Sequence, residues 1–240
     1  MELTYIYHSG FALEGKNFII IIDYYKDSSD DGKHGIVHER LLDSDKQIYV
    51  LVTHSHHDHF NKEVLEWNGN SKDIVYILSK DIYENKLVRP DIGFCLNKSE
   101  IYKDDNIYIK AFGSTDLGIS FYIEAEGKSI FHAGDLNNWH WNEESTEDEI
   151  KEAEDFYANE LNLVADNVKH LDLAMFPVDA RLGKDYMKGA GQFLERIKTD
   201  TFVPMHFGEG YKQAAAFAPI AERCGSRFFD IRHKGQSIEF

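Results

Sequence analysis

The sequence feature that most constrains the fold is a hydrophobic segment that runs directly into a cluster of histidines. Ile48–Thr53 has the length and β-branched content of a buried strand, and the next six residues include four histidines and one aspartate. Imidazole and carboxylate are the ligands that zinc, iron and other borderline divalent metals accept. With 12 histidines in 240 residues, a His-x-His-x-Asp-His string arises by chance in roughly one of several hundred chains. The segment therefore predicts a strand that ends at a metal site.

Four other hydrophobic segments end in a residue that can bind a metal, namely Asp23, Asp135, Asp179 and His206. Sites in open α/β sheets lie beyond the carboxyl ends of the strands, so we expect these side chains to converge. Asp23 is expected to hold ligand histidines through their free ring N–H groups. Asp179 and Arg181 are expected to pair with each other, although a substrate contact is the alternative.

The remaining pattern predicts strands with helices between them, which indicates a layered α/β fold. A helix is expected after the capping box Ser145-Thr146-x-x-Glu149, and two more around residues 187–197 and 212–222. The polar connection 24–46 is either a rim element over a site or a mobile loop. The further predicted strands are 3–7, 18–23, 74–78, 107–112, 119–125, 129–132, 171–176 and 201–205, with two short ones near 228 and 238.

Composition narrows the class of protein. The chain carries 26 Lys and Arg against 42 Asp and Glu, a net charge of −16 that repels phosphate backbones, so nucleic-acid binding is not expected. Two cysteines are too few for a disulfide framework. The longest apolar run, Phe18–Ile22, is far shorter than the ~20 residues that span a bilayer. We therefore expect a cytoplasmic protein that forms a single domain over residues 1–240 and binds no membrane.

The sequence resembles the metallo-β-lactamase superfamily, and more narrowly its intracellular, lactonase-like hydrolases. The likeness rests on five stretches along nearly the whole chain: His8-Ser9-Gly10-Phe11, Asp23, His54 to His59, Ala133-Gly134-Asp135 and Pro204-Met205-His206. It implies a four-layer αββα sandwich with one or two divalent metal ions on one rim, zinc as first choice and manganese or iron as alternatives.

The resemblance also implies a role for each residue of the motifs. The first metal would take His54 and His56, the second would take Asp58, His59 and His206, and Asp135 would bridge the two. Asp58 would in addition orient the attacking water or accept its proton. His8 would contact substrate, with a neutral core histidine as the alternative reading.

One stretch departs from the family pattern. The superfamily normally supplies a further histidine to the first metal from the loop that here reads Gly113-Ser114-Thr115-Asp116-Leu117-Gly118. Three outcomes are open: Asp116 or a hydroxyl takes its place, His8 or His140 reaches in, or the protein works with one metal.

Together these features predict a metal-dependent hydrolase of a small molecule, with a metal-bound hydroxide as nucleophile. Two divalent ions would make the pocket electropositive, which favours an anionic ester, lactone, phosphoester or similar substrate. The alternative is a non-catalytic or degenerate metal-binding member of the same fold, suggested by the missing histidine. Trp139 and Trp141, just beyond Asp135, either form the wall of the substrate pocket or serve only in packing.

Overall fold

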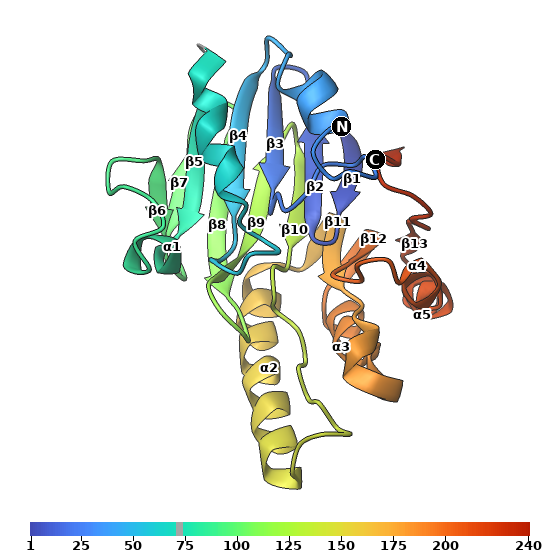
Figure 1. Cartoon of the computed structure of the whole chain (residues 1–240). Coiled ribbons are helices and arrows are strands. Elements are labelled where there is room, and N and C mark those ends of the chain that lie inside the picture. Colours follow the sequence, from blue (N-terminus) through green and yellow to red (C-terminus); the bar gives the residue numbers. More distant parts are fainter. Residues whose placement is uncertain (71–73) are drawn as a thin grey trace.

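The computed structural model describes residues 1–70 and 74–240, and for residues 68–70 it describes only the backbone. Two seven-stranded sheets face each other (Figure 1). In spatial order the first sheet contains β14 (Ser237–Glu239), β1 (Glu2–Tyr7), β2 (Gly10–Glu14), β3 (Phe18–Ile22), β4 (Gln47–Val52), β5 (Ile74–Ser79) and β6 (Phe94–Leu96). The second contains β13 (Arg227–Phe228), β12 (Lys198–Met205), β11 (His170–Pro177), β10 (Lys128–His132), β9 (Ile119–Ala125), β8 (Ile107–Gly113) and β7 (Ile101–Lys103).

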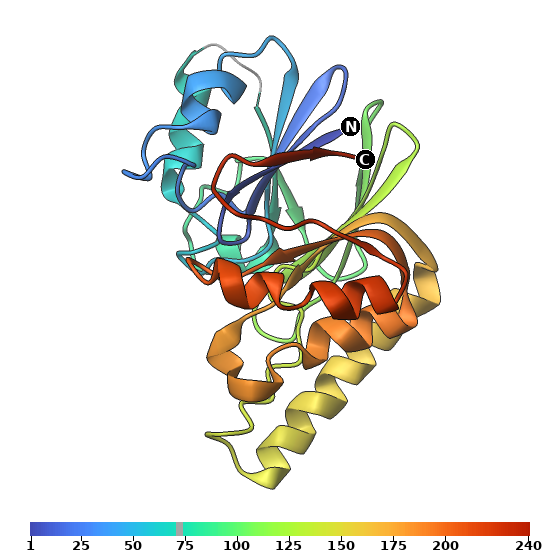
Figure 2. The ribbon, with the colours of Figure 1, turned by 90° about the vertical axis from the view of Figure 1, so that its right-hand side faces the viewer.

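Helices cover the outer face of each sheet, as the turned view in Figure 2 shows. The first sheet is covered by a π-helical turn at Val37–Leu41, a 3₁₀ segment at Lys62–Asn70 and the short helix α1 (Lys80–Glu84). The second is covered by α2 (Glu147–Asn167), a 3₁₀ turn at Ala180–Asp185, α3 (Lys188–Arg196), α4 (Tyr211–Ala215) and α5 (Ala218–Arg223). The predicted αββα sandwich is therefore confirmed. None of the helices described is long and apolar enough to cross a lipid bilayer.

The strand β3 shows why the sequence builds four layers. Its residues Phe18, Ile20 and Ile22 pack between the two sheets, whereas Ile19 and Ile21 pack against the helices on the outer face. A strand buried on both faces must be apolar at every position, because successive side chains point to opposite sides. The unbroken hydrophobic run is thus the signature of an inner strand in a covered sheet.

The structure tests the predicted capping box, the predicted last helix and the predicted long connection. The capping box is present, since the Thr146 side chain accepts from the backbone of Glu149 and the Glu149 side chain from that of Thr146. The prediction of a single helix at 212–222 is wrong. The structure has two helices there, α4 and α5, because Pro219 has no N–H for an α-helical hydrogen bond. Within segment 24–46, the Asp27 side chain accepts hydrogen bonds from the backbone N–H groups of Val37 and His38.

The strand directions bring the polar residues together. The pairs β3–β4, β4–β5, β10–β11 and β11–β12 are all parallel. Their carboxyl ends therefore meet at one edge of the sandwich. The segments that leave this edge contain the histidine motif, Asp135 and His206.

Candidate metal centre

The structure gathers all seven predicted site residues into two adjoining groups. One group consists of His8, Asp58, His59 and His206, and the other of His54, His56 and Asp135. Within each group, one ligand atom from every residue lies within 4.8 Å of the others. These side chains come from the β1–β2 turn and from the ends of β4, β10 and β12. Residues about two hundred positions apart in sequence thus form one cluster.

Asp135 stands between the two groups. Its Oδ2 lies 3.3 Å from His54 Nε2, while its Oδ1 lies 3.1 Å from His59 Nε2 and 3.3 Å from His206 Nε2. The carboxylate is almost fully buried, with 4% of the residue exposed. It therefore faces ligand atoms of both groups, which is the geometry that a bridging carboxylate requires.

Each of three histidines is oriented by a hydrogen bond through its other ring nitrogen. His59 Nδ1 donates to Asp23 Oδ2 at 2.7 Å, His206 Nδ1 to Asp179 Oδ2 at 2.9 Å, and His54 Nδ1 to Thr53 Oγ1 at 3.0 Å. A neutral imidazole that donates through Nδ1 keeps a free lone pair on Nε2. When neutral, each of the three rings therefore turns its Nε2 lone pair toward Asp135, as metal-binding histidines require.

The carboxylates that orient the histidines are themselves buried. Asp23, fully buried, also accepts from the backbone N–H and the hydroxyl of Thr53, at 2.8 and 2.7 Å. It contacts His59 in the way that the sequence predicted. For Asp179 the sequence predicted convergence with the other strand-end residues and a pairing with Arg181, with a substrate contact as the alternative, but its bond to His206 was missed. Asp23 and Asp179 both follow a predicted strand directly, and this position is the sequence signal that could have indicated a histidine contact for each of them.

The electrostatics of the cluster favour a cation. Burial opposes charge on His59, but Asp135 and Asp23 raise its pKa to about 10. Burial also opposes charge on Asp135, yet His59 and His206 hold the pKa of that carboxyl well below its ordinary value. His59 Nε2 and Asp135 Oδ1 are buried without a hydrogen-bond partner among the described residues. Such groups fit a metal ion, which can replace the proton on His59 and satisfy both atoms at once.

In the second group, two ring nitrogens lie within hydrogen-bond distance of each other. His54 Nε2 is 3.0 Å from His56 Nδ1. His56 is exposed, so its ring can adjust to an ion held by His54 and Asp135.

His8 differs from His54, His59 and His206 in the ring nitrogen that carries the proton. It occupies the turn between β1 and β2 with a φ of 59°, and its Nδ1 accepts from the Gly208 N–H at 3.2 Å. A neutral ring that accepts at Nδ1 carries its proton on Nε2. Nε2 lies 3.3 Å from Asp58 Oδ2 and has no hydrogen-bond partner among the described residues. Burial lowers the pKa of His8 to about 4, so it presents a neutral donor to the cluster.

The loop that lacks the family's histidine places a carboxylate beside His56. Asp116 Oδ2 lies 3.6 Å from His56 Nδ1, and its side chain is half exposed. His140 does not reach the cluster, because it is buried with Nε2 3.2 Å from the carbonyl oxygen of Asp185. His8 belongs to the other group. Among Asp116, His8 and His140, Asp116 is the residue that the fold brings next to His56.

A cavity of about 330 Å³ opens over the cluster. Trp139 and Trp141 both line it, and their rings stack with centroids 6.3 Å apart and planes 16° apart. The Trp139 indole N–H donates to the backbone carbonyl of Asp135 at 2.7 Å. A second cavity of about 390 Å³ shares Asp58, Arg181 and His206 with the first. The cluster therefore has space beside it for a small molecule.

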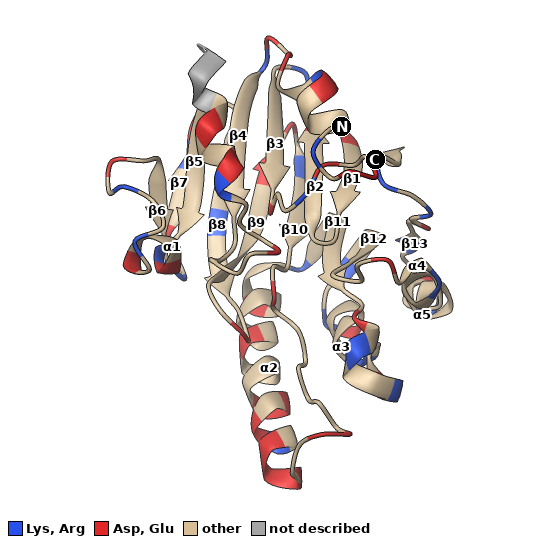
Figure 3. Ribbon diagram, in the orientation of Figure 1, with Lys and Arg blue, Asp and Glu red and all other residues tan. Residues whose placement is uncertain are grey.

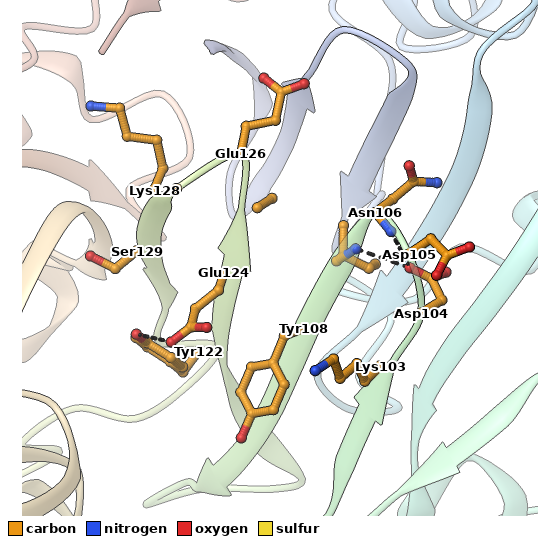
Figure 4. A pocket seen from close by; sticks show the side chains of 13 residues that line it. Lys103, Asp104, Asp105, Asn106, Tyr108, Tyr122, Glu124, Glu126, Lys128 and Ser129 are labelled. Atoms are coloured by element: carbon orange, nitrogen blue, oxygen red, sulfur yellow. Dashed lines mark hydrogen bonds between the residues drawn. The ribbon is translucent and has the colours of Figure 1, made fainter.

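Another hollow, of about 410 Å³, lies at the opposite end of the strands β8, β9 and β10 (Figure 4). Its polar groups largely satisfy one another: the Tyr122 hydroxyl donates to Glu124, and Asp104 accepts from the backbone of Asn106. It contains none of the residues of the metal cluster.

Known proteins resemble this chain both in sequence and in fold. A metal-dependent hydrolase of the UPF0173 family from Pelotomaculum thermopropionicum is 23% identical over 260 residues and covers 100% of both chains. The solved structure of Igni18, a metallo hydrolase from Ignicoccus hospitalis, superposes with a TM-score of 0.70 at 19% identity, covering 100% of this chain and 98% of that one. The diiron β-hydroxylase CmlA from Streptomyces venezuelae also gives 0.70, at 14% identity, with 100% of this chain and 54% of that one covered.

At these identities the two solved structures show a shared fold and no more. The family model described as the beta-lactamase superfamily domain matches residues 2–152. This range is more than half of the chain and contains every residue of the cluster except His206. The chain therefore belongs to the β-lactamase superfamily of proteins with the metallo-β-lactamase fold.

Proposed function

We propose that the protein is a metal-dependent hydrolase of a small molecule. The observation that carries this proposal is the convergence of three histidine Nε2 lone pairs on the two oxygens of Asp135, each ring oriented by a separate hydrogen bond. The relatives named metal-dependent hydrolases support it. So does the cavity over the cluster, which gives a substrate access to the same groups.

The donor set suggests how the ions would be held. His59, His206 and Asp58 would hold one ion, His54, His56 and Asp116 the other, with Asp135 between them. Imidazole-rich sites suit zinc, while the added carboxylates also suit manganese or iron. When bound, such ions supply Lewis acidity and lower the pKa of water at the site.

Two residues of this chain would act on the reacting groups. Asp58 lines both cavities, and in our proposal it accepts the proton of the attacking water. His8 would donate its Nε2 hydrogen to an oxygen of the substrate, since its proton is fixed on that nitrogen by the Gly208 contact. His8 is thus proposed as a substrate-binding donor rather than as a metal ligand.

The substrate we propose is small and anionic, with an ester, lactone, phosphoester or similar bond. Acidic side chains are spread over the molecule and crowd the first turns of α2 (Figure 3). Two divalent ions would reverse the negative charge of Asp58, Asp116 and Asp135 locally, so an anion would be attracted to the site. The thiols of Cys95 and Cys224 are free, which fits the reducing cytoplasm in which we expect the protein to act.

The first experiment measures metal content and turnover together. Protein loaded with zinc, manganese or iron is assayed by elemental analysis and against a panel of esters, lactones, thioesters and phosphodiesters. We expect His59→Ala and Asp135→Ala to lose both metal and turnover, while the exposed His233→Ala, a matched control, keeps both. Circular dichroism checks that the variants fold. Full activity in either cluster variant would refute the proposal.

A second reading is a metal-binding protein without catalysis, and the loop without its histidine favours it. Tight metal binding with no turnover over the whole panel would support that reading. Substitution of Asp116 tests whether the protein binds one metal ion or two. Asp116→Ala should reduce the bound metal from two ions to one, and Asp116→His should restore two. Unchanged metal content in Asp116→Ala would show that this carboxylate is not a ligand.

A further inference from the structure

We propose that Arg181 binds the anionic group of the substrate, and that a flat apolar part of the same substrate lies against Trp139. The substrate class is then a planar, for example aromatic, acid whose negative group stands beside the bond that is cleaved. This inference rests on the proposed hydrolase function and specifies what the site accepts.

Only one edge of the Arg181 guanidinium group forms hydrogen bonds within the described residues. Arg181 follows β11 in the 3₁₀ turn Ala180–Asp185, and its Nε donates to both oxygens of Asp179 at 3.0 and 2.8 Å. Nη2 donates to Asp179 as well. No hydrogen bond to Nη1 exists within residues 1–70 and 74–240, and 62% of the side chain is exposed. The guanidinium is thus fixed along one edge and free along the other.

Arg181 borders the space where a substrate would lie. Arg181 lines both cavities beside the metal cluster, and it is the one Lys or Arg among the described residues that line them. Its Nη2 lies 3.3 Å from His206 Nδ1. A fixed guanidinium recognises a carboxylate or phosphate with directed N–H groups and loses little conformational freedom on binding.

Trp139 supplies the apolar surface next to this charge. Its N–H is tied to the Asp135 carbonyl, and its ring centroid lies 5.6 Å from that of His206. Trp141 stacks behind it and lines the same cavity. Indole faces bind flat apolar groups through large contact areas. A molecule with a planar ring and a negative group therefore matches both features of the cavity.

A purely structural role for Arg181 makes a different prediction. If the residue served only to position Asp179 and through it His206, its loss would weaken metal binding and would affect anionic and neutral ligands alike. A matched control exists on the surface, because Arg232 pairs with Asp230 in the same Asp-x-Arg arrangement, with Nε to Oδ2 at 2.8 Å.

The test titrates metal-loaded protein with 4-nitrobenzoate and with its neutral analogue 4-nitrobenzamide, and follows the quenching of tryptophan fluorescence. In the wild type and in Arg232→Gln, we expect the anion to bind at least about tenfold more tightly. Arg181→Gln should lose most of that preference while its metal content stays unchanged. Trp139→Ala should weaken both probes by a similar factor.

Three results would overturn the inference: a preference retained in Arg181→Gln, which would mean that the metals alone bind the anion; a fall in metal content in that variant, which would assign Arg181 a positioning role; or no binding of either probe at millimolar concentration. Failure of the hydrolase proposal is seen separately, either as an absence of bound metal or as bound metal without turnover on the substrate panel. Where no metal binds, the same titration on metal-free protein still tests Arg181.

Discussion

Metal binding at this site should release a proton, and the affinity should therefore rise steeply with pH. His59 is the reason, since Asp135 at 3.1 Å and Asp23 at 2.7 Å raise its pKa to about 10 despite its burial. Without a metal, the ring is protonated at neutral pH. A metal ion can bind Nε2 only after that proton has left.

The size of the effect follows from the pKa. At pH 7.5 the pH lies about 2.5 units below the pKa of His59, so roughly one ring in three hundred is neutral. Displacing the proton costs about 3 kcal/mol, which weakens the apparent affinity by a factor of a few hundred. The sign is fixed: affinity increases as pH rises toward about 10, by roughly tenfold per pH unit from this residue alone.

The assay is calorimetry of zinc binding to metal-free protein in two buffers with different ionisation enthalpies, repeated from pH 6.5 to 8.5. The difference between the buffers counts the protons released. Asp23→Asn is the matched variant. Its side-chain amide would donate to His59 Nδ1 and place the ring proton on Nε2, so we expect about 10- to 100-fold weaker binding and a shallower pH dependence. An affinity that stays constant over this range, with no proton release, would refute the role assigned to His59.

Three substitutions test how the fold supports the site. Gly118→Ala should destabilise the protein by about 1–3 kcal/mol and weaken metal binding, since φ is +73° and a Cβ would lie 2.1 Å from the Thr53 carbonyl oxygen; thermal unfolding and metal titration measure this. Tyr157→Phe should cost about 1–2 kcal/mol in urea unfolding and leave metal content unchanged, because its hydroxyl donates to the Gly189 carbonyl at 2.7 Å. Phe193→Ala should cost about 3–5 kcal/mol in the same measurement, since its fully buried ring packs against two other phenylalanines.

The layered fold could be predicted because the signals that specify it are local. The run Phe18–Ile22 is apolar at every position, and such a run is typical of a strand covered on both faces. The rule that sites lie beyond the carboxyl ends of strands then places Asp135 and His206 near the histidine motif. The structure brings these residues together, and their roles as ligands stay predictions.

The parts that could not be predicted depend on contacts between distant residues. The tautomer of His8 is set by the Gly208 N–H, two hundred positions away. The orientation of His206 depends on a hydrogen bond from its ring to Asp179, and no pattern in the sequence specifies that bond. The short strands β6 and β7 have three residues each, too few for a periodic pattern. Pro219, by contrast, is visible in the sequence and could have indicated the break between α4 and α5.

The proposed function and the proposed substrate class both require that side chains from the two sheets hold metal ions at one edge of the sandwich. Anomalous diffraction from crystals of the zinc-loaded protein tests it most directly. We predict a peak within coordination distance of His59, His206 and Asp135, and a second beside His54, His56 and Asp116. A map with no anomalous peak at this edge, although zinc is present in the crystal, would contradict the assignment.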